Sequence, residues 1–503
     1  MLTIAWRSLL RGTAGAIVAA GISVPVLADE AGDRSVLSLP QSESVPQSES
    51  QGALGSETQS QSADETASAG PILGDVLADE PETTPGAVPG LQLAQGITTY
   101  ETRRRLRDQP RRGETVADRP RPQYDPLGQR IGSFVLFPEL RVLEQYESNI
   151  YYTEDNEDDD FITRLQPRLT LQSDWNNHQL RLETGGDIGF YADHSEENFQ
   201  DYYAGAAGRI DIRRSTQLRL ETRYSHDHES RESPDDADAG SGGQVADEPT
   251  QLDIYSAGAS LRHVFGRING TLGGTFDRIS FDDPDAVGGG TINEHDRDRD
   301  IYEGYVRVGY EIQPQYEAFV RGAYNKRVYD GLENGVDRDS DGYTMAVGLA
   351  VDFGGLVFGD FFAGYRYQNY DDPTLDSLSG FGGGADITWN VTKLTTITGS
   401  LQGDLRETTQ TNASGRLVTT GELGIDHELR RNILLGANLR ATRDDYEGIN
   451  RTDWIYGAGG DVTYLVNRYL RGSLGYEFRK RDAESTQDDF TNHIIFLRVG
   501  LQY

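Results

Sequence analysis

The chain ends on the stretch His493-Ile-Ile-Phe-Leu-Arg-Val-Gly-Leu-Gln-Tyr503, and this stretch decides the predicted fold. Every second residue in it is apolar or aromatic: Ile495, Leu497, Val499, Leu501 and Tyr503. A strand in a bilayer needs this pattern, because alternate side chains meet acyl chains while neighbouring strands satisfy the backbone. An edge strand of a soluble sandwich explains the alternation equally well, but not the terminal aromatic. We therefore predict the last strand, and the assembly signal, of an outer-membrane β-barrel.

The composition fits a barrel and excludes a helical membrane protein. Charged residues make up 25% of the chain, and no stretch after the first thirty residues approaches the roughly 20 apolar residues of a spanning helix. A barrel passes this test because only half of each strand is apolar. The chain has no cysteine, which excludes disulfides and thiolate metal sites and favours an oxidising compartment.

The first residues predict export. Arg7 and Arg11 precede an apolar run from Ala14 to Leu27, and small residues end at Ala28, where we expect signal peptidase to cleave. A membrane anchor is the alternative interpretation of this run. Removal of residues 1–28 changes the net charge from −34 to −36, because two arginines are lost. So acidic a mature protein repels polyanions, which argues against nucleic acid as a partner.

Residues 29–130 predict a disordered, low-complexity periplasmic tail. They are rich in Ser, Gln, Glu, Gly and Pro and bury too little apolar area to offset chain entropy. The sign of the charge turns basic in a cluster of arginines: Arg103, Arg104, Arg105, Arg107, Arg111 and Arg112. This basic segment is either a solvated linker or a contact for anionic lipid, a polyanionic glycan or peptidoglycan.

Residues 131–503 repeat one theme, in which ten to fourteen alternating residues are followed by a connection that is short and then long. The long connections are acidic, such as Glu154 to Asp160, Ser233 to Pro249 and Asp282 to Asp296. Tight turns on one side and extended loops on the other are typical of bacterial barrels. We predict an all-β fold, a transmembrane antiparallel up-and-down barrel of roughly 18 strands (16–18), with both ends on the periplasmic side. A barrel of this size encloses a water-filled or plugged lumen.

Within each predicted strand the charged residues stay on one face, which we assign to the lumen. The candidates are Arg181, Glu183, Arg219, Glu221, Arg223, Arg307, Arg321, Arg366, Glu477 and Arg479. Opposed arginines and carboxylates can brace the wall or set the transverse field of a pore, and both interpretations stay open. Tyrosines gather toward the strand ends and predict an interfacial girdle: Tyr151, Tyr152, Tyr191, Tyr224, Tyr324, Tyr329 and Tyr370.

The motif Glu144-x-Tyr146-x-x-Asn149-Ile150-Tyr151, followed by an acidic loop and by Phe161-Ile-Thr-x-Leu-x-Pro167, resembles the putative β-barrel porin family, whose members are often encoded with exopolysaccharide genes. The resemblance extends by strand pattern over about residues 131–503. It implies an outer-membrane barrel that helps a surface polysaccharide to leave the cell, and it supplies no functional residues to carry over. The tail lies outside the resemblance, and Tyr503 stands where such barrels more often end in Phe.

Catalytic and metal-binding motifs are weak. None of the eight histidines lies in a recognisable Ser or Asp motif, so we predict no enzyme and no cofactor. His226 and His228 share a strand face and could hold a metal, or belong to the girdle or to the base of a loop. Asp337, Asp339 and Asp341 imitate the first half of a calcium loop, but the expected twelfth-position Glu is replaced by Gly348.

The sequence therefore predicts a porin-type conduit for hydrophilic solutes or for an exported polysaccharide. A structural or adhesive barrel without transport is the second interpretation, and an outer-membrane hydrolase is the third. The expected partners are outer-membrane lipid, lipopolysaccharide, the barrel-assembly machinery and an exported polysaccharide. The number of barrels that associate is not predicted.

Overall fold

The computed structural model describes residues 114–233, 246–287, 289–332, 335–406, 408, 410, 412–484 and 488–503. The predicted signal peptide and residues 29–113 of the predicted tail lie outside the described residues. Two short 3-10 helices, η1 (Ser195–Glu197) and η2 (His295–Arg297), accompany the strands. No helix among the described residues is long and apolar enough to cross a membrane.

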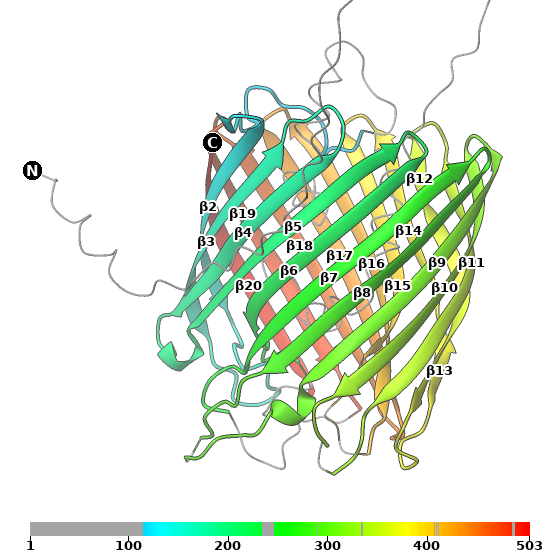
Figure 1. Cartoon of the computed structure of the whole chain (residues 1–503). Coiled ribbons are helices and arrows are strands. Elements are labelled where there is room, and N and C mark those ends of the chain that lie inside the picture. The colour runs from blue at the N-terminus through cyan, green and yellow to red at the C-terminus, as the bar shows by residue number, and fades with distance from the viewer. Residues whose placement is uncertain are drawn as a thin grey trace, which may run out of the picture. The chain divides into compact units, whose positions relative to one another are not determined.

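The described part of the chain is built almost entirely from strands (Figure 1). They are β1 (Gln129–Ile131), β2 (Phe134–Glu147), β3 (Asp160–Ser173), β4 (Gln179–Tyr191), β5 (Phe199–Arg213), β6 (Thr216–His228), β7 (Gln251–Phe265), β8 (Ile268–Phe281), β9 (Arg299–Gln313), β10 (Tyr316–Tyr329), β11 (Ser340–Asp352), β12 (Val357–Tyr370), β13 (Leu378–Phe381), β14 (Gly384–Thr392), β15 (Thr395–Arg406), β16 (Gly415–Arg430), β17 (Ile433–Glu447), β18 (Thr452–Leu465), β19 (Leu470–Asp482) and β20 (Phe490–Gln502).

The sheet closes into a barrel because the first long strand pairs with the last. β2 and β20 are antiparallel, with Leu140 opposite Leu501 and Val142 opposite Val499. Each other long strand pairs with its neighbours in sequence, and β12 also pairs with both β13 and β14. Eighteen long strands form the ring, since β1 and β13 are short additions of three and four residues. The predicted antiparallel barrel and its strand number are confirmed.

The two ends of the barrel differ in their connections. Two-residue turns join β5 to β6, β7 to β8, β9 to β10, β14 to β15 and β16 to β17, and Tyr503 lies at this same end, which we call the turn end. The other end, the loop end, carries the long connections, including residues 229–250 and 282–298. This asymmetry is the one that the sequence predicts.

The two faces of each strand follow the predicted alternation. Ile495, Leu497, Val499 and Leu501 of β20 are 40 to 54% exposed on the outer face, and Tyr503 stacks on Tyr469 with ring centroids 5.8 Å apart. Ile494 and Phe496, apolar residues on the opposite face, are buried, because the Phe496 ring covers Gly475 of β19 on the lumen side.

The predicted tyrosine girdle is only partly correct. Tyr224 lies on the outer face beside Tyr255, with ring centroids 4.7 Å apart, and Tyr324 is 54% exposed there. Tyr191, Tyr329 and Tyr370 lie instead on the face that carries the lumen charges, and Tyr329 and Tyr370 are buried. The position of a tyrosine at a strand end does not tell whether its side chain faces lipid or lies under a loop that folds back over the lumen.

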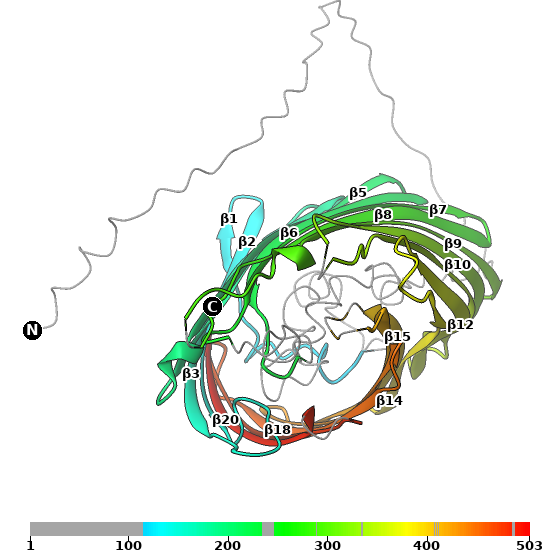
Figure 2. The ribbon, with the colours of Figure 1, turned by 90° about the horizontal axis from the view of Figure 1, so that it is seen from below.

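The folded chain begins earlier than the tail boundary predicted at residue 130. Residues 114–128, which we call the entry segment, pack against the lumen wall near the turn end (Figure 2, cyan trace inside the ring). Val116 is buried against Leu434 and Leu465, and its amide donates to Thr396 Oγ1 over 2.9 Å. One apolar residue in a polar, Pro-rich stretch is too weak a signal to reveal this contact from the sequence.

A matched pair of substitutions tests the assignment of faces. Leu401 is 42% exposed on the outer face of β15, and its neighbour Ser400 faces the lumen. We expect Leu401→Arg to destabilise the barrel by about 2–4 kcal/mol, because it places a charge among acyl chains, whereas Ser400→Arg changes stability little. Denaturant unfolding in phospholipid vesicles measures both values. Equal destabilisation by the two variants would contradict the assignment.

Candidate solute pathway

The structure places all ten predicted lumen residues on the face opposite the exposed apolar side chains. Most of them lie in ion pairs along the wall. Arg307 pairs with Glu317 at 2.8 Å, Arg366 with Asp404 at 2.8 Å, and Arg181 with Glu183. The lumen lining therefore carries both positive and negative charges, as a surface in contact with water and polar solutes does.

The remaining predicted lumen residues also follow the strand registers. The Arg223 guanidinium lies 4.1 Å above the ring of Tyr203, whose hydroxyl donates to Glu183. Arg219 and Glu221 lie on the same face of β6, and Arg321 lies opposite Arg307 in the β9–β10 ladder.

A cluster of arginines that was not among the predicted residues gathers where the barrel closes. Arg141, Arg164, Arg471 and Arg498 come from β2, β3, β19 and β20, and each is less than a tenth exposed. Leu143 of β2 lies between Arg164 and Arg498, and Gly500 of β20 lies between Arg141 and Arg471.

Two carboxylates accompany this arginine cluster. Glu139 accepts from both Arg141, at 2.7 Å, and Arg471, while Asp187 accepts from Arg164. A third carboxylate, Asp461 of β18, attracts Arg498, so each of the four arginines has a carboxylate near it. The sequence could not reveal this, because the strands concerned stand at opposite ends of the barrel sequence.

One part of the β6–β7 connection crosses the lumen. Residues 229–233, which we call the crossing segment, follow β6, yet the Glu232 carboxylate accepts from Arg479 Nη1 of β19 at 2.8 Å and the Glu232 carbonyl accepts from Arg481 at 2.8 Å. Five strands separate β6 from β19 along the shorter arc, a path of about 29 Å at the usual strand spacing. The contact can form only if the segment leaves the wall and spans the interior (Figure 2).

Two further arginine–carboxylate pairs join the crossing segment to η1 and to η2. Arg297 of η2 donates to both carboxylate oxygens of Glu229 at 2.8 and 2.9 Å, and Arg231 donates to Glu197 of η1 at 2.9 Å. Bidentate arginine–carboxylate pairs hold geometry well. Burial disfavours a charged Arg297 side chain, but Glu229 and Glu294 outweigh it and raise the pKa of Arg297 further. These ion pairs hold the segment across the lumen near the loop end.

The wall beneath the connections at the loop end is apolar, which the sequence did not predict. Leu252, Ile254, Ile279, Phe281 and Ile301 form a buried cluster on the lumen face of β7, β8 and β9. The guanidinium of Arg297 lies 4.0 Å above the Phe281 ring. Apolar side chains on both faces of these strand ends indicate that loops, not water, cover the lumen face here.

The predicted metal sites are not assembled. No group of three or more His, Asp or Glu side chains among the described residues is arranged to hold an ion. Asp339 Oδ1 accepts from the Tyr329 amide at 2.7 Å, while Asp341 lies near the Tyr324 hydroxyl.

The two histidines also separate. His226 bonds to Asp253 at 2.9 Å, and His228 bonds to Asp201 at 2.9 Å while it stacks on Phe199. The structure therefore gives them a structural place at the base of a loop.

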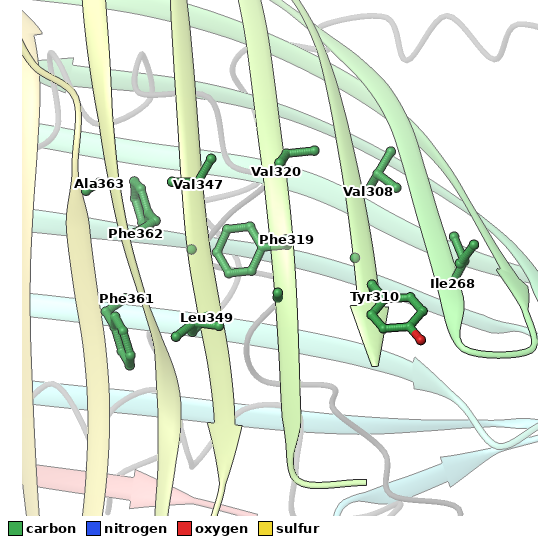
Figure 3. Close-up of a pocket in the computed structure, with 13 residues that line it drawn as sticks. Ile268, Val308, Tyr310, Phe319, Val320, Val347, Leu349, Phe361, Phe362 and Ala363 are labelled. Atoms are coloured by element: carbon green, nitrogen blue, oxygen red, sulfur yellow. The ribbon is translucent and has the colours of Figure 1, made fainter. Parts of the chain in front are cut away.

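A hollow of about 790 Å³ lies on the outer face and does not belong to the pathway (Figure 3). Val320 and Val347, which line it, are 53 and 62% exposed on the face that meets lipid. Gly309 and Gly348 also line the hollow, but their side-chain positions point to the lumen, where the Phe319 ring covers Gly348. The hollow is therefore a dent in the apolar belt.

The closed ring, the apolar belt and the charged, constricted lumen define an outer-membrane barrel of the porin type. The chain matches the family model described as "Putative beta-barrel porin 2" over residues 121–503 and belongs to that family. The match confirms the resemblance inferred from the sequence and includes the second half of the entry segment.

Solved structures with a similar fold are distant in sequence. They include OccK3 (OpdO) of Pseudomonas aeruginosa (12% identity, 74% of this chain and 96% of that chain, TM-score 0.38) and OccK9 (OpdG) of the same organism (13%, 74% and 99%, 0.40). The siderophore receptor PirA from Acinetobacter baumannii is also similar (7%, 75% and 81%, 0.41). No curated protein sequence matches the chain.

The crossing segment can be tested through the Glu232–Arg479 pair. Both side chains are less than a tenth exposed, and the loss of one partner leaves a buried charge uncompensated. We expect Arg479→Gln to release the segment and to speed tryptic cleavage after Arg231 by roughly tenfold, as the population of the open form rises. In the control, Arg443→Gln breaks a pair that is over 40% exposed on the outer face, and the cleavage rate should not change. An unchanged rate in the Arg479 variant contradicts the crossing.

The connection before η1 predicts a pH dependence. Burial lowers the pKa of His194, but the hydrogen bond to Asp160 and the surrounding carboxylates outweigh it, so the pKa is raised above its ordinary value of 6.5. The protonated imidazole therefore adds stability that is fully present below pH 6.5 and is lost as the pH rises through the raised pKa. The difference in unfolding temperature between wild type and His194→Gln should shrink from acidic to alkaline pH. A difference that grows with pH would refute this.

Proposed function

We propose that the protein is a passive conduit for hydrophilic solutes across the outer membrane, narrowed by the crossing segment. The observation that supports this most is the combination of a charged, two-signed lumen wall with a peptide segment held across it by Arg479 and Arg297. In a scaffold without transport, the same ion pairs would only brace the wall. Charge pairs on both sides of a constriction create a transverse field that orients and sorts solutes.

The gathering of four arginines where the barrel closes, at Arg141, Arg164, Arg471 and Arg498, supports a preference for anionic solutes. Guanidinium groups recognise carboxylates, phosphates and sulfates through paired hydrogen bonds. An acidic exported polysaccharide carries such groups along its length, and it is the second candidate solute. The Arg223 guanidinium stacked on Tyr203 adds a surface suited to sugar rings and their hydroxyls.

The orientation that we propose puts the turn end and both chain termini in the periplasm. An even number of strands returns the chain to the side of the membrane on which it entered. The residues before the entry segment then stay in the periplasm. The structural or adhesive barrel is the alternative function. The hydrolase is the third function; the histidines that bond to carboxylates, such as His194 and His228, lie at the bases of loops.

Single-channel recording tests the conduit. The refolded full chain in a planar bilayer should give stable conductance steps, and Arg479→Gln should enlarge them roughly twofold because the constriction opens. Added acidic polysaccharide should block the steps if the glycan is a solute, and leave them unchanged if the protein passes small solutes only. A correctly folded, heat-modifiable barrel without any steps would leave the structural alternative.

Ion selectivity tests the arginine cluster separately. Under an about tenfold salt gradient, the wild-type reversal potential should report anion preference, and Arg498→Glu should shift it toward cations. Arg440→Glu, on the lumen face of β17, is the matched control, because Arg440 stands beside Glu422 and outside the cluster. Equal shifts in both variants would show that only the total lumen charge matters.

A further inference from the structure

The barrel wall has a seam in its loop-end half, between β13 and β15. β14 pairs with β15 up to Gly384 and Gln402, but among the described residues no ladder joins β13 to residues 403–406 of β15. Both β13 and β14 continue the register of β12, so the break lies on the β15 side. One backbone bond, from the Gly403 amide to the Gly383 carbonyl at 3.2 Å, marks where the ladder ends.

Beyond the break, the β15–β16 hairpin turns into the lumen. We call its described residues between Asp404 and Leu417 the hairpin tip. Arg327 of β10 donates to the Leu405 carbonyl at 3.4 Å, although four strand spacings, about 19 Å, separate β10 from β15 along the wall. Arg338, after β10, donates to the carbonyls of Ala413 and Ser414 at 3.3 Å. A Cβ on Gly415 would come within 2.8 Å of the Tyr370 hydroxyl on β12. The tip therefore lies inside the barrel, against the lumen faces of β12 and β13.

The strands overlap at the seam through apolar side chains. Leu405 and Leu417 continue the faces of Leu401 and Leu423, which are 42 and 43% exposed to the membrane side, yet Leu405 is only 2% exposed. Leu405 and Leu417 pack against Tyr370 and Leu378, which belong to the lumen faces of β12 and β13. Side-chain packing, and not a backbone ladder, separates lipid from lumen here. Outside the overlap, Phe381 is 63% exposed.

Glycines permit this construction. A Cβ on Gly383 would lie 2.9 Å from the Phe362 carbonyl, and a Cβ on Gly384 would lie 2.9 Å from the Leu401 carbonyl, so larger residues would push the strands apart. The other face of the hairpin tip is basic. Arg406 and Arg416 lie opposite each other in the ladder and face the lumen, with Arg416 held by Asp444 at 2.5 Å.

We propose that the seam is a lateral passage for a single-chain anionic amphiphile of the membrane. The acyl chain lies along Leu378, Leu405 and Leu417 once their packed side chains part, and the anionic head group reaches Arg406 in the lumen, beside Arg416, which is 1% exposed and stays paired with Asp444. The apolar and basic faces of the hairpin tip match the two parts of such a molecule. A closed ladder cannot let an acyl chain pass, because its backbone hydrogen bonds would have to break in lipid. Packed side chains can part and close again.

Photocrosslinking in proteoliposomes tests the passage. The probe is a lysophosphatidylglycerol with a diazirine beside its head group, and labelled residues are mapped by mass spectrometry. Because the native chain has no cysteine, Leu378→Cys with Leu405→Cys locks the seam by oxidation and frees it by reduction. With the seam free, we expect labels on the lumen-facing residues Asp404, Arg406 and Arg416. Locking should reduce this labelling about tenfold relative to labels on the outer face, and reduction should restore it.

Two controls keep the proposal open to refutation. Thr420 and Thr442, on the lumen faces of β16 and β17, have hydroxyls 3.1 Å apart, and a cysteine pair there locks a continuous ladder and should not alter labelling. Arg406→Gln, and a zwitterionic lysophosphatidylcholine probe on the native chain, should each lower lumen labelling about threefold. Lumen labelling that persists when the seam is locked, or that is absent when it is free, overturns the proposal. The heat-modifiable gel shift verifies that each variant is folded.

Discussion

The pairing of β2 with β20 is the constraint on which the rest of the structure depends. Without water in the bilayer, each backbone amide and carbonyl needs a partner within the protein, so the sheet has to close. Closure brings the first and last long strands together and thereby places Arg141 and Arg164 beside Arg471 and Arg498. It also fixes which side chains face lipid, because a shift of one residue in the pairing would exchange the two faces of the shifted strand. The charged lining and the apolar belt are two consequences of one register.

An 18-strand ring encloses more space than side chains from the wall can fill, and the chain fills part of it with its own connections. The entry segment lies at the turn end, through Val116 and the pair of Arg121 with Glu428 at 3.1 Å. The crossing segment and the β15–β16 tip occupy the loop-end half. In each case an arginine makes the long-range contact: Arg121, Arg479 and Arg338. A long side chain with a planar, permanently charged end can reach from a wall to a segment in the interior and still satisfy several acceptors.

The sequence predicts the features that depend on the alternation of residues within a strand and on local turns. It misses the contacts that form across the lumen. The fold, the strand number, the outer face of β20 and the lumen face of Arg181, Arg307 and Arg479 all follow from alternation within single strands. The partner of Arg479 could not be predicted, because Glu232 lies in an acidic connection whose path across the lumen leaves no periodic signal. Tyr329 and Tyr370 were misplaced for the same reason, since a buried tyrosine under a loop and a girdle tyrosine have the same position in a strand. The apolar residues Leu252 and Ile254 on a lumen face were the available sign that a loop covers that face.

The seam shows how the closure rule can be relaxed at one place. The ladder between β14 and β15 is intact over the turn-end half, where an unpaired edge would lie deep in the apolar belt. It ends where Gly382, Gly383 and Gly384 allow the strands to overlap, and β13 then keeps its pairing with β12 while residues 403–406 of β15 keep theirs with β16. Each of these edges retains one ladder and exchanges the other for packing between Leu378, Leu405 and Leu417. Replacing backbone pairing by side-chain packing lowers the free energy of local opening at the seam. The ring is kept, because hydrogen bonds still close the barrel on the turn-end side of the break. The guanidinium of Arg406 on the lumen side of the hairpin then favours an anionic ligand at that local opening, while Arg416 stays paired with Asp444.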